Sequence, residues 1–68
     1  MPAAAVTSFP ALLGAPVADA VAAIRASNAA LHVVALEEGG MMTMDWREDR
    51  VRVIHNAAGL VTQVPRVG

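Results

Sequence analysis

The chain has 68 residues, which is enough for one small domain. It contains no cysteine, so disulfide bridges, thiolate metal sites and a cysteine nucleophile are excluded. Its net charge of −1 gives no general attraction to nucleic acid or anionic lipid, and no apolar run approaches the roughly 20 residues that span a bilayer. Although 56% of the residues are hydrophobic, 15 residues are alanine. The core therefore has to be built from a few valine, leucine and isoleucine side chains.

Residues 1–8 are small and show no pattern, so we expect them to form a flexible N-terminal arm. A single domain is predicted over residues 9–68, because no repeat or linker divides this stretch. Its first segment, 9–14, is short, apolar and closed by a glycine, which favours an irregular turn against the core. The chain start has neither a basic stretch nor a long apolar run, so no signal peptide is predicted. We therefore expect a cytoplasmic protein, or a secreted one if Met1 replaces a removed leader.

A helix is predicted over residues 17–27. Pro16 suits its first turn, where the missing N–H has no partner in any case. Asn28 is expected to end the helix, because asparagine tolerates the left-handed conformation found there. The apolar side chains that define the buried face follow helical spacing: Val17, Ala20, Val21 and Ile24.

Three short strands are predicted after the helix. Residues 31–36 form an apolar run with β-branched side chains, which favours a buried strand. Residues 50–54 alternate polar and apolar side chains. A third strand is predicted over 60–65, where a proline near its end favours an edge position. The alternation in the second strand places Val51 and Val53 toward the core, and Arg50 and Arg52 together on the opposite face.

The segment between the first two strands, residues 37–49, is unusual for a small domain. It is long enough for a crossover between parallel strands, which needs about a dozen residues. It holds three of the four methionines and the only tryptophan, where a small protein normally exposes polar groups. Irregular connections of this length are usually functional or disordered. We therefore interpret the segment as a surface for a binding partner.

Four sequence blocks occur in an informative order. They read Phe-Pro-Ala-Leu-Leu-Gly at 9–14, Thr-Met-Asp-Trp-Arg at 43–47, Asp-Arg-Val-Arg-Val at 49–53, and Val-Pro-Arg-Val-Gly at 64–68. Together they resemble the potato inhibitor I family of serine protease inhibitors, over residues 9–68 without a gap. The resemblance implies an α+β fold: one helix packed on a small mixed β-sheet, with a long exposed reactive-site loop between two parallel strands.

The resemblance also implies a substrate-like, standard-mechanism inhibitor whose reactive-site bond is Met44–Asp45. Met44 would be the P1 residue that enters the S1 pocket of the protease, and Trp46 would be P2′. An unbranched apolar P1 side chain favours subtilisin-like and chymotrypsin-like proteases, with elastase-like enzymes as a further target class. The implied protease-contacting residues are Met41, Met42, Thr43, Met44, Asp45, Trp46 and Arg47. The implied loop-supporting residues are Thr43, Asp45, Arg50, Arg52 and Gly68.

The supporting role has a physical reason, because a flexible loop offered to a protease is simply a substrate. In a loop without disulfides, charge-assisted hydrogen bonds from Arg50 and Arg52 are the available supports, and guanidinium geometry suits them. The pair Gly39-Gly40 stands where family members often have a proline before a single glycine. The second glycine is expected to add freedom to the upstream part of the loop.

Each of these residues also has a simpler interpretation. The two arginines fit the solvated face of an alternating strand. Met41, Met42 and Met44 fit core filling, and Trp46 fits a plug against the body. An alternative function is a non-inhibitory protein-interaction module that uses the Met/Trp-rich loop as a docking surface. An enzyme is not predicted, because the histidines are isolated and no nucleophile has a catalytic setting. We expect serine proteases as partners, no nucleic acid or membrane, no cofactor or metal, and a monomer.

Overall fold

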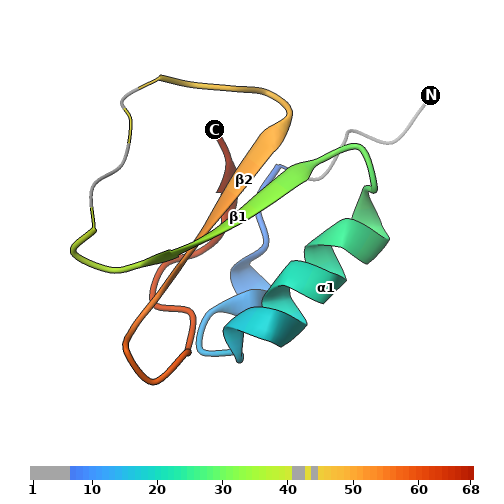
Figure 1. Cartoon of the computed structure of the whole chain (residues 1–68). Coiled ribbons are helices and arrows are strands. Elements are labelled where there is room, and N and C mark those ends of the chain that lie inside the picture. The colour runs from blue at the N-terminus through green and yellow to red at the C-terminus, as the bar shows by residue number, and fades with distance from the viewer. Residues whose placement is uncertain (1–6, 41–42, 44) are drawn as a thin grey trace.

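The computed structural model describes residues 7–40, 43 and 45–68. Its three strands form one sheet in the order β1-β2-β3, and the helix α1 packs against one face (Figure 1). This is the α+β fold, one helix on a small mixed sheet, that was predicted. The elements in chain order are a 3-10 helix Pro10–Leu12, α1 Val17–Ser27, β1 His32–Glu37, β2 Arg50–His55 and β3 Arg66–Val67.

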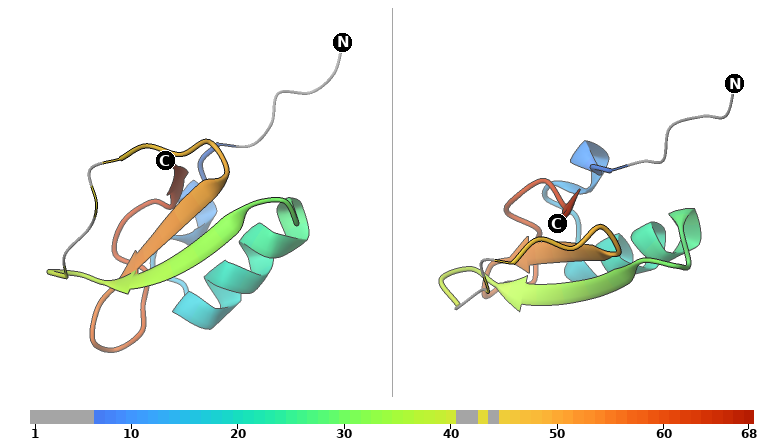
Figure 2. Two further views of the ribbon diagram at one scale, coloured as in Figure 1. Left: turned by 45° about the horizontal axis from the view of Figure 1, so that its top comes forward. Right: turned by 90° about the horizontal axis from the view of Figure 1, so that it is seen from above.

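Strand pairing determines where the long connection lies. β1 and β2 are parallel and in register from His32↔Arg50 to Glu37↔His55, whereas β2 and β3 are antiparallel. A connection between parallel neighbours has to cross from the end of one strand to the start of the next. Residues 38–49 make this crossover, and their described downstream part, 45–49, passes close to the C-terminal end of the chain (Figure 2).

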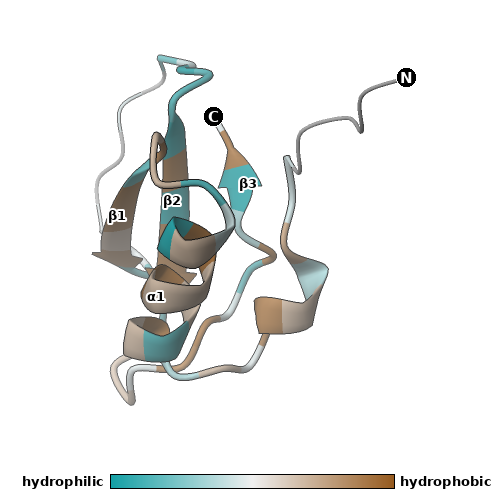
Figure 3. Cartoon of the chain, turned by 90° about the vertical axis from the view of Figure 1, so that its right-hand side faces the viewer, coloured by the Kyte–Doolittle hydropathy of each residue, from teal (hydrophilic) through white to brown (hydrophobic). Residues whose placement is uncertain are grey.

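The core lies between α1 and the face of the sheet that carries the odd-numbered residues of β2. Both predicted faces are confirmed, because Ala20 and Ile24 of α1 and Val51 and Val53 of β2 are fully buried. Figure 3 shows the alternation as teal and brown bands along β2. Partly buried side chains from the rest of the fold complete the core: Phe9, Leu12, Val17, Val21, Leu31, Val33 and Val67.

The helix has the predicted bounds, but its end differs from the expectation. Asn28 has φ −153° and ψ 102°, which is extended backbone, so the predicted left-handed conformation is wrong. The side-chain oxygen of Asn28 accepts a hydrogen bond from the N–H of Ala30 at 3.0 Å, and the N–H of Asn28 donates to Ile24. This side-chain bond replaces a left-handed cap, because asparagine can close a turn through its own amide.

β1 is less buried than its apolar sequence predicted. Its residues alternate poorly in burial, and Val34 in the middle of the strand is exposed. The reason is topological: β1 lies at the edge of the sheet, and α1 covers only one of its faces. The prediction of a buried strand is therefore wrong, although Val33 packs against the core.

The third strand is displaced along the chain from its predicted position. Leu60 and Val61 form only isolated bridges, to Pro16 and His55, after a turn in which Gly59 has φ +82°. Residues 63–64 then line a hollow beside β2 instead of pairing with it. The strand β3 forms only beyond Pro65, which is buried and has no N–H for a ladder. The prediction of a strand over 60–65 is therefore wrong.

The described N-terminal residues belong to the folded part of the chain. The N–H of Val67 donates to the oxygen of Thr7 at 2.9 Å, and Ser8 forms a bridge with Arg66. Ordered pairing thus begins before Phe9, and residues 1–6 of the expected arm lie outside the described residues. Within the described residues, none of the helices has the length and apolar character to cross a membrane.

Candidate functional site

Two arginines stand at the start of β2 on the face opposite α1. Because side chains alternate along a strand, Arg50 and Arg52 share this face while Val51 between them is buried in the core. Their side chains are only 12% and 19% exposed. They are therefore not the solvated strand face of the simpler interpretation, but are covered by other parts of the molecule.

Arg50 binds two segments that are distant in the sequence. Its Nη2 donates to the main-chain oxygen of Asp45 at 2.8 Å, and its Nη1 donates to the Asp45 carboxylate at 3.3 Å. Its Nε donates to the main-chain oxygen of Gly68 at 2.8 Å, and the N–H of Gly68 donates back to the main-chain oxygen of Arg50. One side chain thus joins the crossover connection to the C-terminal residue.

Arg52 reaches the other side of the predicted reactive-site bond. Its Nη2 donates to the Thr43 hydroxyl at 2.7 Å and lies 3.6 Å from the Asp45 carboxylate. The two arginines therefore hold residues 43 and 45, the immediate neighbours of position 44. Met44 itself, like Met41 and Met42, lies outside the described residues.

The Asp45 carboxylate is stabilised in its charged form. The Thr43 side-chain hydrogen bond is the main cause that lowers the pKa of Asp45 below its ordinary value of 3.8; desolvation opposes it, and the positive charge of Arg50 adds to the lowering. Near neutral pH the group is therefore an ionised acceptor. It is also solvent-exposed, so its attraction to the arginines is screened by water and salt.

A second ion pair lies further along the connection. Arg47 donates to Asp49 through Nε at 3.0 Å and Nη2 at 2.9 Å, in the bidentate arrangement typical of arginine and carboxylate. This bond raises the pKa of Arg47 and lowers that of Asp49. The N–H of His32 donates to the main-chain oxygen of Asp49. The pair was not predicted from the sequence, although an arginine two residues before an aspartate was the available signal.

Trp46 lies on the surface of the connection. Its side chain is 68% exposed, which excludes the interpretation of a plug against the body. One edge of the indole nevertheless meets the chain end. A Cβ atom added to Gly68 would lie 3.3 Å from Cδ1 and 3.4 Å from Nε1 of Trp46. The tryptophan therefore rests beside Gly68 and leaves most of its ring to solvent.

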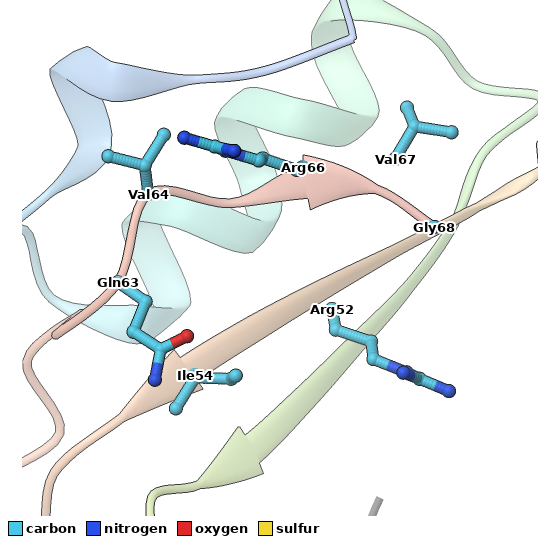
Figure 4. A pocket seen from close by; sticks show the side chains of 7 residues that line it. All are labelled: Arg52, Ile54, Gln63, Val64, Arg66, Val67 and Gly68. Atoms are coloured by element: carbon cyan, nitrogen blue, oxygen red, sulfur yellow. The ribbon is translucent and has the colours of Figure 1, made fainter. Parts of the chain in front are cut away.

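A hollow opens on the same face of the sheet, between β2 and the C-terminal segment (Figure 4). Its volume is about 230 Å³. Beside this space, the pairing of β2 with β3 and the bond from Arg50 to Gly68 join β2 to the C-terminal segment. The residues that line it are Arg52, Ile54, Gln63, Val64, Arg66, Val67 and Gly68.

Metal and cofactor chemistry has no visible basis in the part of the chain that the structure describes. No group of three or more histidine and acidic side chains comes together there in a way that would hold a metal ion. The polar groups that do converge are two arginines, a threonine hydroxyl and a carboxylate: Arg50 and Arg52 both contact Asp45, and Arg52 also binds Thr43. Such a set fixes the course of the backbone and offers no free nucleophile or base.

Comparison with known proteins shows which family the chain belongs to. The sequence profile of the Potato inhibitor I family matches residues 2–68. The chain belongs to the potato inhibitor I family. A flax (Linum usitatissimum) protein named "Proteinase inhibitor" is 42% identical over 60 residues, which cover 88% of this chain and 87% of the relative. The "Inhibitor of trypsin and hageman factor" of Cucurbita maxima is 42% identical over 62 residues, or 91% of each chain.

Solved structures show the same fold. The crystal structure of the bitter gourd trypsin inhibitor superposes with a TM-score of 0.91 at 34% identity over the whole of both chains. The solution structure of Cucurbita maxima trypsin inhibitor-V gives a TM-score of 0.71 at 42% identity over 91% of each chain. The family resemblance and the fold class predicted from the sequence are thus confirmed. These relatives are inhibitors, in agreement with the prediction that the chain is not an enzyme.

Proposed function

We propose that this potato inhibitor I protein inhibits serine proteases in a substrate-like manner and presents the Met44–Asp45 bond to the active site. The observation that carries the proposal is that Arg52 binds Thr43 while Arg50 binds Asp45. A pair of supports on the two neighbours of one residue has no use in a surface connection that only joins two strands. It has a use if the backbone at that residue must keep one conformation.

The energetic reason is the entropy of the loop. Fixing the backbone of one residue costs roughly 1–2 kcal/mol, so ordering about six contact residues on binding would cost roughly 6–12 kcal/mol. A nanomolar complex has a total binding free energy of only about 12 kcal/mol. Burial of one methionine side chain contributes about 1.5–3 kcal/mol, which is too little to offset the cost of ordering the loop. The affinity is therefore set by how far Arg50 and Arg52 order the loop beforehand.

The same bonds act after cleavage. If a protease cuts Met44–Asp45, the new amino terminus at Asp45 stays bound to Arg50, and Thr43 stays bound to Arg52. The amine then remains beside the acyl-enzyme instead of diffusing away. A tethered amine has a high effective concentration, so re-formation of the peptide bond competes with attack by water.

The P1 residue determines the target class. Met44 is apolar and unbranched, which suits the broad hydrophobic S1 pockets of subtilisin-like and chymotrypsin-like proteases, and elastase-like enzymes as a further class. Two relatives are named for trypsin, whose pocket carries a buried aspartate. A methionine offers that aspartate no positive charge. We therefore infer a different specificity for this chain within the same family.

Titration against protease tests the proposal. Increasing amounts of the protein are added to nanomolar subtilisin and to chymotrypsin, and residual activity is followed with a chromogenic substrate. The expected result is a linear, stoichiometric loss of activity, with intact inhibitor recovered by mass spectrometry. Rapid fragmentation without inhibition would show a substrate. Binding to active-site-blocked subtilisin, without loss of activity of the free enzyme, would favour the alternative of a non-inhibitory interaction module.

A further inference from the structure

We propose that Gly68 is a positioning residue for Trp46, and that it presets the indole for the site that binds the second residue after the reactive bond. This inference rests on the proposed inhibitor function. It concerns the leaving-group side of the loop, where Trp46 is the large apolar side chain offered to the protease. Gly68, which sets the position of Trp46, lies 22 residues further along the chain and directly follows β3.

The geometry around Gly68 is tight on one side only. A Cβ atom at this position would stand 3.3 Å from Cδ1 and 3.4 Å from Nε1 of Trp46, closer than ordinary van der Waals contact. The indole edge thus occupies the space that a side chain at position 68 would need. Trp46 keeps 68% of its surface exposed, so its opposite face is available to a partner.

Gly68 is not required here for its backbone freedom. The glycines with positive φ are Gly14, Gly39 and Gly59. Because Gly68 lies outside the left-handed region, alanine fits its backbone conformation without strain. What a methyl group at this position would change is the place of the indole. This separates the contact with Trp46 from the ordinary reasons for a glycine.

Gly68 is itself held by hydrogen bonds with Arg50, so the position against which Trp46 packs is fixed. The Arg50 Nε donates to the Gly68 oxygen, the Gly68 N–H donates to the Arg50 oxygen, and Arg50 Nη2 holds the Asp45 oxygen next to Trp46. Asp45, Arg50, Gly68 and Trp46 therefore form a closed ring of contacts. Arg50 and Gly68 therefore orient both the main chain at Asp45 and the side chain of Trp46.

The consequence concerns affinity and partner choice. A tryptophan that rests on Gly68 before binding loses less side-chain freedom in the complex than one that rotates freely. Proteases that offer Trp46 an apolar surface should therefore bind this inhibitor more tightly. An alanine at position 68 keeps both main-chain bonds to Arg50 and moves only the indole, so its effect should depend on the presence of Trp46.

A double-mutant cycle tests this with four proteins: the parent, Gly68→Ala, Trp46→Ala and the double variant. Inhibition constants are measured against subtilisin, and folding is checked by urea denaturation. We expect Gly68→Ala to weaken inhibition about three- to tenfold in the parent and to have no further effect beside Trp46→Ala. A loss of equal size in both backgrounds, or no loss in either, would overturn the inference.

Two spectroscopic measurements on the free protein need no protease. In the parent, nuclear Overhauser contacts are expected between the indole Hδ1 and the Gly68 Hα protons. In Gly68→Ala, the Nε1–H resonance of the single tryptophan should shift and its fluorescence anisotropy should fall. Absent contacts and an unmoved resonance would overturn the inference without reference to inhibition. If these contacts are present while none of the four proteins inhibits a protease, the proposed function fails and the contact stands.

Discussion

The Arg50 guanidinium binds both the main chain and the side chain of Asp45, at 2.8 Å from the Asp45 carbonyl oxygen and at 3.3 Å from its carboxylate. The first bond does not depend on ionisation of Asp45, whereas the second requires the charged carboxylate. The two can therefore be separated by pH. The relative strengths of these two bonds decide how far acid loosens the loop.

Acid should loosen the side-chain half of this arrangement. Thr43 and Arg50 lower the pKa of Asp45, so the carboxylate contributes stability that is complete above its ordinary value of 3.8. This contribution is lost as the pH falls through the lower folded-state pKa. We expect an NMR titration of the Asp45 carboxyl carbon with a midpoint below 3.8, accompanied by faster exchange of the Arg50 Nη1 protons, which donate to this carboxylate.

The matched control for this titration is Asp45→Asn, which keeps the main-chain acceptor and has no proton to gain. In this variant the exchange of the Arg50 Nη1 protons should show no step over the same pH range. Asp49, whose pKa is lowered by Arg47, also titrates in acid, and its carboxyl carbon is followed as a second probe. An Asp45 midpoint at or above its ordinary value would contradict the prediction.

The core should respond to loss of a single side chain. Ile24 is fully buried beside Val51 and Val53. Ile24→Ala removes buried methyl groups and leaves a cavity, which typically costs about 2–5 kcal/mol of unfolding free energy. Urea denaturation followed by circular dichroism measures this change. Ala22→Ser on the exposed face of α1 is the control and should cost about 0.5 kcal/mol or less; equal effects of both changes would contradict the placement of the core.

Periodic segments of this fold were predictable, and segments decided by tertiary pairing were not. Helical spacing identified α1 to the residue, and alternation separated Val51 and Val53 from the arginines. The apolar run of β1 did not reveal that the strand lies at the sheet edge, because edge position depends on which strands pair. The place of β3 after Pro65 likewise depends on how the chain returns to β2 from the turn at Gly59.

The site shows the same division. Family resemblance indicated which residues belong together, and Arg50, Arg52, Thr43 and Asp45 do meet in the structure. The bidentate pair of Arg47 and Asp49 was missed because Arg47 was assigned to the protease-contacting residues and Asp49 was given no partner. The contact between Trp46 and Gly68 joins two ends of the chain, and no local pattern in either segment predicts it.

Specificity should follow position 44. Met44→Lys places a positive charge at the proposed P1 residue, where it can pair with the buried aspartate of a trypsin pocket. We expect weak or no inhibition of trypsin by the parent and clear inhibition by the variant, measured as inhibition constants under the same conditions. Arg25→Lys, a change on the exposed face of α1, is the control and should leave trypsin unaffected. Equal trypsin constants for the parent and Met44→Lys would refute the P1 assignment.

Removal of both loop supports tests mechanism apart from contact. Arg50→Ala together with Arg52→Ala leaves the buried faces of β2 and α1 intact, because Val51 and Val53 supply the core. Each lost bond to a charged group is worth roughly 1.5–3 kcal/mol, so inhibition of subtilisin should weaken about 10²–10⁴-fold. Cleavage at Met44–Asp45 should also accelerate, because the new terminus at Asp45 is no longer held near the acyl-enzyme.

Mass spectrometry after incubation with active subtilisin shows this as early fragments 1–44 and 45–68. Circular dichroism and urea denaturation establish that the double variant remains folded, and Arg25→Ala on α1 controls for the loss of an exposed cation far from the loop. Restoring Arg52 alone should recover part of the affinity, because its bond to Thr43 at 2.7 Å supports the upstream side by itself. A double variant that inhibits as tightly and survives as long as the parent would show that the arginines do not order the loop, and that its conformation is set elsewhere.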